Sequence, residues 1–218
     1  MALPPSLSEQ PALLIADTSV VINLNATGCA ETILKALPHR VAVVDVVVDE
    51  IKGGVRKGRQ DAMKLDALIV ANVVEVVKLG PQGLLRFENL VVGSAGETLD
   101  DGEAATIAYA EEAGARAVID ERKARRLAAE RQATIPLGCT ADLLAYSNVE
   151  RAVGIAGIAD AVHNALIGAR MRVLDQHMDW VVRLIGDERA VVCSSLPEIT
   201  RQQARARLLR FSALGQGV

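Results

Sequence analysis

The chain has 218 residues, of which 50% are hydrophobic and 23% charged, and its 24 basic and 27 acidic side chains give a net charge of −3. This composition is typical of one globular α/β domain, or of a smaller domain with an appendage. No apolar stretch is long enough to span a bilayer, so no membrane partner is expected. The acidic balance argues against a protein that coats duplex nucleic acid, and one Trp, two Tyr and two Phe provide few side chains for stacking on bases.

The N-terminal ten residues contain no basic residue ahead of an apolar run, so no secretory signal is predicted and a cytoplasmic protein is expected. The three cysteines are far apart and form no C-x-x-C pair, which indicates small buried side chains rather than a zinc or redox site. The three histidines are also expected to be structural. These six residues are Cys29, Cys139, Cys193, His39, His163 and His177.

Short apolar runs alternate with amphipathic stretches along the first 150 residues. Strands are predicted at 12–16, 41–44, 73–78, 115–119 and near 133–136. Helices are predicted to start at 17–19 and to cover 29–37, 46–54, 59–72, 100–112 and 121–132. Unbroken apolar strands suit a parallel sheet that is covered on both faces. The alternation therefore predicts a three-layer α/β/α sandwich with a central, mainly parallel sheet and right-handed crossovers.

The composition changes after residue 148, where helical spacing replaces strand character. Helices are predicted at 155–166, 171–185 and 200–214. We therefore expect a domain over residues 1–150 and a helical extension over residues 151–218. An apolar stripe around Trp180 is typical of a packing surface, and we expect the extension to form a homodimer, a higher oligomer or a contact with a partner protein.

Acidic residues follow the predicted strands. Asp17 ends the first strand, Glu50 lies about one helical turn beyond the second, Glu103 is in the first turn of its helix, and Asp120 with Glu121 follows the strand at 115–119. Each residue alone is also explained as a helix cap or as an acid favoured at a helix N-terminus. Sites in open parallel sheets form at the carboxyl ends of the strands, so the joint placement predicts one negatively charged site.

Carboxylates that lie within a few ångströms of one another repel, and they stay ionised only where a cation compensates or some pKa values rise. Mg²⁺ and Mn²⁺ are hard ions that take oxygen ligands and retain waters. Such ions can generate hydroxide and stabilise the developing charge on a phosphodiester. The acids therefore predict a site for Mg²⁺ or Mn²⁺, which needs neither His nor Cys.

Four ordered motifs, ALLIADTSVVINL, VVVDEI, LDDGEAATIAYA and AVIDERKARRLA, resemble a PIN-domain nuclease over about residues 12–140. The resemblance is to the branch in which Gly-Glu opens the helix that carries the third acid. It implies that the catalytic metal is held by Asp17, Glu50, Glu103 and Asp120, with the hydroxyl of Ser19 assisting beside the first of them. It further implies a metal-dependent endoribonuclease like the toxins of toxin–antitoxin pairs, which leaves a 5′-phosphate and a 3′-hydroxyl and has a cognate antitoxin as partner.

Two departures from the family pattern leave alternatives open. Many members have Thr or Ser, one residue and then Asp after the fourth strand, whereas this chain has Ile119-Asp120-Glu121, so either acid could be the fourth ligand. Glu103 stands where many members carry Asp, and Asp100 or Asp101 could compete for its role. The alternative function is a catalytically inactive PIN-like module that acts through protein or RNA binding.

A basic helix follows Asp120. Its cations are predicted to attract an RNA backbone through charge, although a solvated face with pairing to Glu121 and Glu130 explains them equally well. These cations are Arg122, Lys123, Arg125 and Arg126.

Two other α/β enzymes are disfavoured by the residues that follow the first strand. The segment ADTSVV has no glycine, so it lacks the phosphate-binding turn of a dinucleotide-binding protein. A haloacid-dehalogenase-type phosphatase would carry a second Asp at the position of Ser19.

Overall fold

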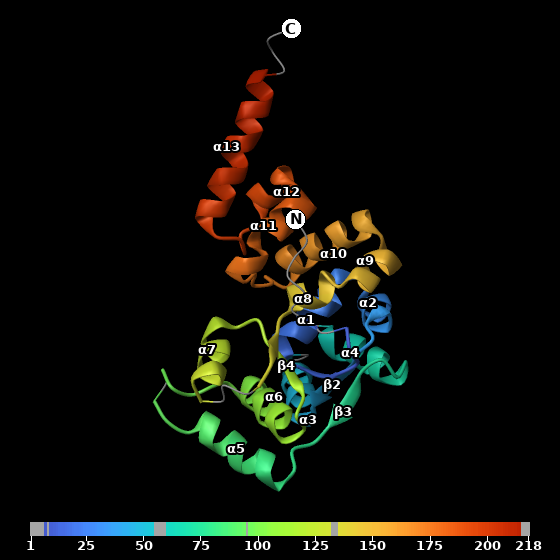
Figure 1. Ribbon diagram of the computed structural model, residues 1–218, viewed down its shortest axis with the longest axis vertical. Coiled ribbons are helices and arrows are strands. Elements are labelled where there is room, and N and C mark those ends of the chain that lie inside the picture. Colours follow the sequence, from blue (N-terminus) through green and yellow to red (C-terminus); the bar gives the residue numbers. More distant parts are fainter. Residues whose placement is uncertain (1–6, 8, 55–59, 95, 132–134, 215–218) are drawn as a thin grey trace.

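The computed structural model describes residues 7, 9–54, 60–94, 96–131 and 135–214, and it contains a five-stranded sheet at its centre (Figure 1). The strands are all parallel and lie in the order β3-β2-β1-β4-β5. Their bounds are β1 (Leu13–Ala16), β2 (Arg40–Val44), β3 (Glu75–Val77), β4 (Arg116–Val118) and β5 (Leu137–Gly138). The last strand follows the stretch near 133–136 in which it was predicted, and residues 132–134 of that stretch lie outside the described residues.

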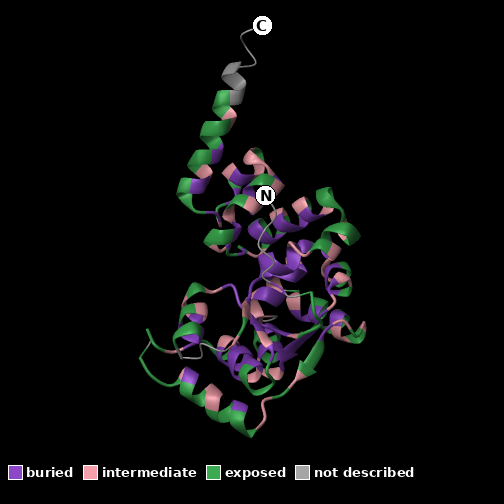
Figure 2. Cartoon of the chain, viewed as in Figure 1, coloured by how far each residue is buried: buried purple, intermediate pink, exposed green. Residues whose placement is uncertain are grey.

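Alternate residues of the strands point to opposite faces of the sheet, as a pleated strand requires. Leu14 and Val43 join a hydrophobic cluster on one face, and Ile15 and Val44 join a second cluster on the other. The first face is covered by α1 (Thr18–Thr27), α2 (Ala30–Ala36) and α4 (Asp61–Val70), with α3 (Asp45–Gly53) adding side chains to the same cluster. The second face is covered by α5 (Pro81–Val91), α6 (Asp101–Glu112) and α7 (Arg122–Arg131). The predicted three-layer sandwich is thus confirmed, with its buried residues gathered around the sheet (Figure 2).

Helix α5 was not among the predicted elements. It begins with Pro81 at its first turn and packs on α6, where Arg86 pairs with Glu111 at 2.7 Å. Only Gly83 and Leu90 of this helix are buried. Phe87, Leu90 and Val91 recur at helical spacing and pack on the second cluster, so the sequence carries an apolar pattern for this helix that was missed.

Among the described residues, six helices follow the sheet, whereas the sequence predicted three after residue 150. They are α8 (Thr140–Leu144), α9 (Ser147–Val153), α10 (Ile155–Gly168), α11 (Asp175–Ile185), α12 (Asp187–Val192) and α13 (Glu198–Leu214). Helix α11 starts four residues later than predicted, because residues 171–174 form a non-helical loop.

The hydrophobic cluster on the first face of the sheet continues into these helices. It joins Leu14 of β1 and Leu24 of α1 to Leu166 of α10 and Val181 of α11. The helices after residue 150 therefore share a core with the sheet, and the domain boundary near residue 150 stays a prediction.

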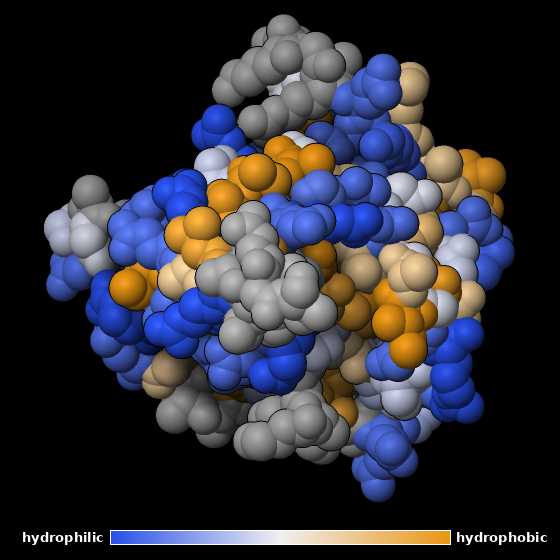
Figure 3. Space-filling model, turned by 90° about the horizontal axis from the view of Figure 1, so that it is seen from above, coloured by the Kyte–Doolittle hydropathy of each residue, from blue (hydrophilic) through white to orange (hydrophobic). Residues whose placement is uncertain are grey.

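Helix α13 extends away from the rest of the molecule (Figure 1). Val192, Ile199 and Leu209 of α12 and α13 are each more than half exposed, at 68%, 61% and 66%. Figure 3, which views the molecule from above, shows hydrophobic patches separated by hydrophilic side chains on this face. The expected oligomer or partner contact stays a prediction. Among the described residues, no helix combines the length and the apolar character needed to cross a membrane.

Candidate active site

The strand order creates a switch point between β1 and β4. The chain runs from β1 outward to β2 and β3 on one side, and to β4 and β5 on the other, so the carboxyl ends of β1 and β4 border the crevice in which open α/β sheets bind ligands. Asp17 follows β1 directly, and its backbone N–H donates to the carbonyl oxygen of Val118 at 3.2 Å. Asp120 comes two residues after the end of β4. Two of the predicted acids thus lie at neighbouring strand ends.

Asp17 is the N-terminal cap of α1 and is only 2% exposed. Its Oδ1 accepts the backbone N–H of Val20 at 2.7 Å, and the hydroxyl of Ser19 donates to both carboxylate oxygens at 2.9 and 3.0 Å. Burial raises the pKa of Asp17 well above its usual value, and the charges of Asp120 and Glu103 raise it further, whereas the hydrogen bonds from Val20 and Ser19 lower it. Asp17 therefore both caps α1 and belongs to the candidate site, so the two interpretations of this residue do not exclude each other.

Asp120 is also 2% exposed, and its acceptors are directed by two residues that the sequence did not single out. Its Oδ2 accepts Nδ2 of Asn23 at 2.7 Å and the hydroxyl of Thr140 at 2.5 Å, while Oδ1 accepts the backbone N–H of Thr140 at 2.8 Å. Burial raises the pKa of Asp120, and these hydrogen bonds oppose the rise. A signal for Asn23 exists in the sequence, because it lies one helical turn beyond Ser19 on α1.

Glu121 is turned toward a different partner. Nη1 of Arg172, which comes from the loop before α11, lies 2.7 and 2.5 Å from its two carboxylate oxygens. Of the two adjacent acids, Asp120 is the one whose charge raises the pKa of Asp17. The geometry therefore favours Asp120 as the companion of Asp17.

Glu103 lies in the first turn of α6, and its Oε2 accepts the backbone N–H of Asp100 at 3.4 Å in a capping box. Burial raises the pKa of Glu103 to about 7; the charges of Asp100 and Glu121 add to the rise, while the backbone hydrogen bond from Asp100 and the charge of Lys123 oppose it. Asp100 is used as the cap of the helix, and Asp101 is exposed. Glu103, which is partly buried, is thus the acid of this turn that is neither the cap nor fully exposed.

Glu50 of α3 lies against the same turn of α6. Its Oε2 accepts the hydroxyl of Thr18 at 2.6 Å. A Cβ atom at Gly102 would lie 2.4 Å from this oxygen and 2.8 Å from the hydroxyl oxygen of Thr18. The glycine before Glu103 therefore lets α3 and α6 approach closely enough for the exposed Glu50 to reach Thr18, the residue after Asp17.

The four acids form an open row rather than a closed cage. In the part of the chain that the structure describes, no three of them bring their carboxylate oxygens within 4.8 Å of one another. Their donors are all oxygen atoms, and burial keeps the pKa values of Asp17, Glu103 and Asp120 high. A hard divalent cation fits such a donor set, because it would favour the ionised form of each carboxyl.

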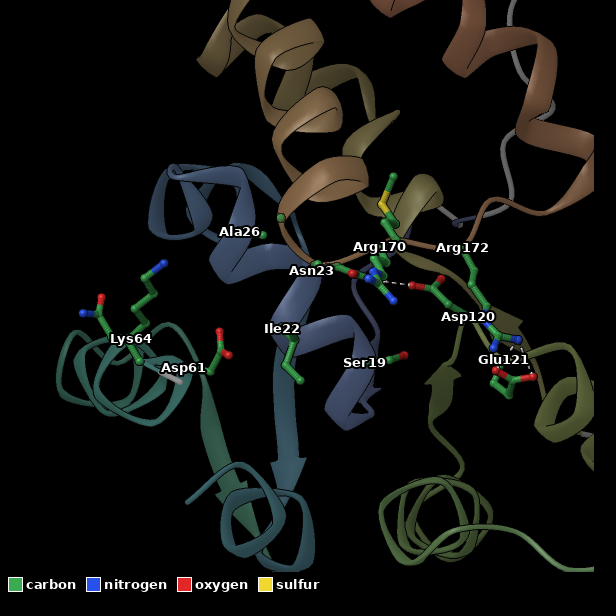
Figure 4. Close-up of a pocket in the computed structure, with 14 residues that line it drawn as sticks. Ser19, Ile22, Asn23, Ala26, Asp61, Lys64, Asp120, Glu121, Arg170 and Arg172 are labelled. Carbon is green, nitrogen blue, oxygen red and sulfur yellow. Dashed lines mark hydrogen bonds and ion pairs between the residues drawn. The ribbon is translucent and has the colours of Figure 1, made fainter. Parts of the chain in front are cut away.

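A cleft of about 880 Å³ opens beside this row (Figure 4). Ser19 and Asn23 of α1, Asp120, Glu121, and Asp61 and Lys64 of α4 line it from the sheet side, and residues 168–172 line it from the C-terminal helices. A smaller pocket of about 160 Å³ contains Glu50 and Thr18 and shares Ile22 and Asp61 with the cleft. Of the four acids, Asp120 lines the cleft and Glu50 lines the smaller pocket, whereas Asp17 and Glu103 line neither of them.

The four predicted RNA-binding residues of α7 contact different groups within the protein. Arg125 donates to the backbone carbonyls of Ile119 and Gly138 at 3.0 and 2.6 Å. The other three have charged neighbours: Arg126 pairs with Glu130 at 3.0 Å, Arg122 pairs with Asp175 at 2.6 Å, and Lys123 is close enough to lower the pKa of Glu103. The RNA-binding role of this helix stays a prediction.

A second cluster begins at Cys139, the residue before the Asp120 partner Thr140, and connects this part of the chain to α11. The ligand atoms of Cys139, Asp142 and His177 all lie within 4.8 Å of one another, and Nε2 of His177 is 2.7 Å from Oδ1 of Asp142. All three side chains are buried. Burial, and then the charge of Asp142, raises the pKa of the Cys139 thiol, so it stays protonated. A closed cluster with a neutral thiol is suited to joining helices, not to cleaving a polymer.

The sequence did not predict this cluster. Cys139 and His177 were each expected to be structural, and Asp142 was not considered. His177 lies 35 residues beyond Asp142 in the sequence. Sequence spacing therefore gives no indication that His177 contacts Cys139 and Asp142.

Comparison with known proteins gives one match. The model of a family described as PIN domain matches residues 13–187, which includes both the sheet and the helices through α11. No similar protein was found among curated proteins or among solved structures. PIN domains have a nuclease fold and generally use divalent metal ions, in agreement with the oxygen donors at the carboxyl ends of β1 and β4. With four fifths of its length matched, the chain belongs to the PIN-domain family.

Proposed function

We propose that the protein is a metal-dependent endoribonuclease that hydrolyses RNA phosphodiester bonds with Mg²⁺ or Mn²⁺. The observation that supports this best is the row of acids from four separate elements, bordered by a cleft at the switch point of the sheet. Asp17, Glu50, Glu103 and Asp120 would hold the metal, and Glu121 adds a carboxylate at the mouth of the cleft. When bound, such an ion activates water and stabilises the negative charge that develops on the phosphate.

The chain's own residues keep the acids in position. Ser19 and the N-terminus of α1 direct the oxygens of Asp17, while Asn23 and Thr140 direct those of Asp120. These hydrogen bonds are made before any substrate arrives, so little reorganisation is needed in the reaction. We assign Ser19 the role of an auxiliary hydroxyl and the acids the role of metal ligands.

The test is cleavage of an end-labelled single-stranded RNA in Mg²⁺ or Mn²⁺ by wild type, Asp17→Asn and Asp66→Asn. Asp66 is an exposed acid on α4 and serves as the matched control. We expect cleavage by wild type and by Asp66→Asn that leaves 5′-phosphate ends, and loss of at least 100-fold in Asp17→Asn. Equal activity in all three proteins would reject the site.

Calorimetric titration with Mn²⁺ separates this function from a non-catalytic module. Saturable binding that disappears in Asp17→Asn supports a working metal site. If wild type neither binds Mn²⁺ nor cleaves RNA, the chain acts as a PIN-like module that binds protein or RNA. We further propose an antitoxin partner, which would be encoded beside this protein and would inhibit its cleavage of RNA.

A further inference from the structure

The cleft has a second wall, which the resemblance to nucleases did not anticipate. Residues 168–172, from the end of α10 to the loop before α11, line the cleft opposite Ser19, Asn23, Asp120 and Glu121. In Figure 4, Arg170 and Arg172 reach from this loop toward Asn23 and Glu121. We propose that this loop binds the phosphate backbone of single-stranded RNA through Arg170 and Arg172, a proposal that rests on the function proposed above.

The loop presents its arginines because the residues between them are anchored. Met171 is 1% exposed and Val173 6% exposed, and both belong to the main hydrophobic cluster. The backbone N–H of Met171 also donates to the carbonyl oxygen of Ala165 at 3.0 Å. Arg170 and Arg172, which alternate with these residues, are exposed. Burial of Met171 and Val173 therefore anchors the loop backbone and leaves Arg170 and Arg172 at the cleft.

The backbone of Arg170 supports a role for its side chain. Its φ is +55°, in the left-handed region, at the position just after the C-cap Ala169 of α10. Glycine or asparagine usually occupies this position, since a larger side chain is strained there. Backbone strain that persists at the edge of a cleft points to function.

The charges of the cleft fit a phosphate chain. Three acids and three cations line it: Asp61, Asp120 and Glu121, and Lys64, Arg170 and Arg172. Among the described residues, the guanidinium of Arg170 has no hydrogen-bond or ion-pair partner. Arg172 pairs with Glu121, but the pair is solvent-exposed, with 62% and 30% of the two side chains accessible, and exposed pairs are weak enough to exchange for phosphate.

The lining also indicates how RNA is read. None of the described residues that line the cleft is aromatic, so they offer bases no ring to stack on. Contacts to phosphates position a nucleic acid without reading its sequence. We therefore expect the loop to contribute affinity and register, with little preference for particular bases.

The test measures binding of a fluorescent single-stranded RNA in EDTA over a series of salt concentrations. The variants are Arg170→Gln with Arg172→Gln, and the control Arg205→Gln with Arg210→Gln. Both control arginines are exposed on α13, so the two double variants have the same net charge. A phosphate contact to a single strand contributes about 0.7 to the slope of log K against log salt. The cleft variant is expected to lower the slope by about 1.4 and the affinity at low salt by about 10- to 100-fold, while the control matches wild type.

A third variant, Arg170→Asn, separates binding from folding. Asparagine tolerates the left-handed region, so its Tm should equal or exceed that of wild type while RNA binding weakens. The proposal is overturned if the cleft variant keeps the wild-type slope and affinity, or if all binding changes follow a loss of Tm. The salt dependence of RNA binding is measured without metal. A lower slope in the cleft variant would therefore support phosphate binding by Arg170 and Arg172 even if the protein did not cleave RNA. Conversely, cleavage with an unchanged slope rejects the loop alone.

Discussion

Replacing Glu103 by Gln is expected to stabilise the metal-free protein at alkaline pH. Burial raises the pKa of Glu103 to about 7 from an ordinary value of 4.5. Below that ordinary value the carboxyl is protonated in both the folded and the unfolded chain, so pH has no effect through it. As pH rises, the unfolded chain ionises first, and the folded state loses stability until Glu103 also ionises. The cost is complete above about pH 7.

The size of the effect follows from the pKa difference. A rise from 4.5 to about 7 corresponds to roughly 3.4 kcal/mol at 1.36 kcal/mol per pH unit. Glu103 is only partly buried, so solvent screening reduces the expected effect to about 1–2 kcal/mol. For a chain of this length, that free energy corresponds to about 2–8 °C in Tm. Gln retains the capping box with Asp100, because Gln and Glu serve equally at that position.

The assay is thermal unfolding in EDTA at pH 5 and pH 8. Glu103→Gln should exceed wild type in Tm at pH 8, with a gain several-fold smaller at pH 5. Glu88→Gln, an exposed glutamate of α5, is the control and should show no gain at either pH. Excess Mn²⁺ should reverse the order, since wild type gains binding free energy that the variant lacks. The reasoning is refuted if Glu103→Gln is less stable than wild type at pH 8 without metal, or gains equally at both pH values.

Three further changes test the positions of the acids and the buried cluster. Thr140→Val removes a hydroxyl donor from Asp120 and should lower the free energy of unfolding by about 1–3 kcal/mol, measured by urea unfolding. It should also weaken Mn²⁺ binding, measured by calorimetry. Thr140→Ser keeps the hydroxyl and should restore both the stability and the binding. Gly102→Ala should displace Glu50 and reduce RNA cleavage at least tenfold with a change in Tm of only a few degrees, and unchanged kinetics would contradict this. His177→Leu removes the imidazole from the buried carboxylate of Asp142 and should cost about 3 kcal/mol or more in urea unfolding, so a loss near zero would show that the pair does not hold α11 in place.

The fold and the acidic row could be predicted because their signals are local. Each strand is a short apolar run, and Asp17 and Asp120 directly follow two of them, so the rule for parallel sheets brings these acids to one edge without knowledge of the strand order. The motif around Gly102 and Glu103 added the third element. The family match and the all-parallel sheet confirm the predicted fold, while the metal-binding role of the four acids stays a prediction.

The partners of these acids could not be predicted, because they come from distant parts of the chain. Asn23 and Asp120 are 97 residues apart, and Thr140 reaches Asp120 only because β5 ends beside β4. The second wall of the cleft depends on how α10 packs on α1, which periodicity within either helix does not specify. Arg170 in particular carries no motif, and its left-handed backbone is visible only in the fold.

The continuous hydrophobic cluster has a practical consequence for working with this protein. Leu166 and Val181 are 1% and 0% exposed because they pack in the cluster that also contains Leu14 and Leu24. A fragment cut at residue 150 would lack Leu166 and Val181 and would expose the apolar residues that they cover. Such a fragment should precipitate or associate when expressed, so assays on a shortened chain would report its insolubility rather than its chemistry.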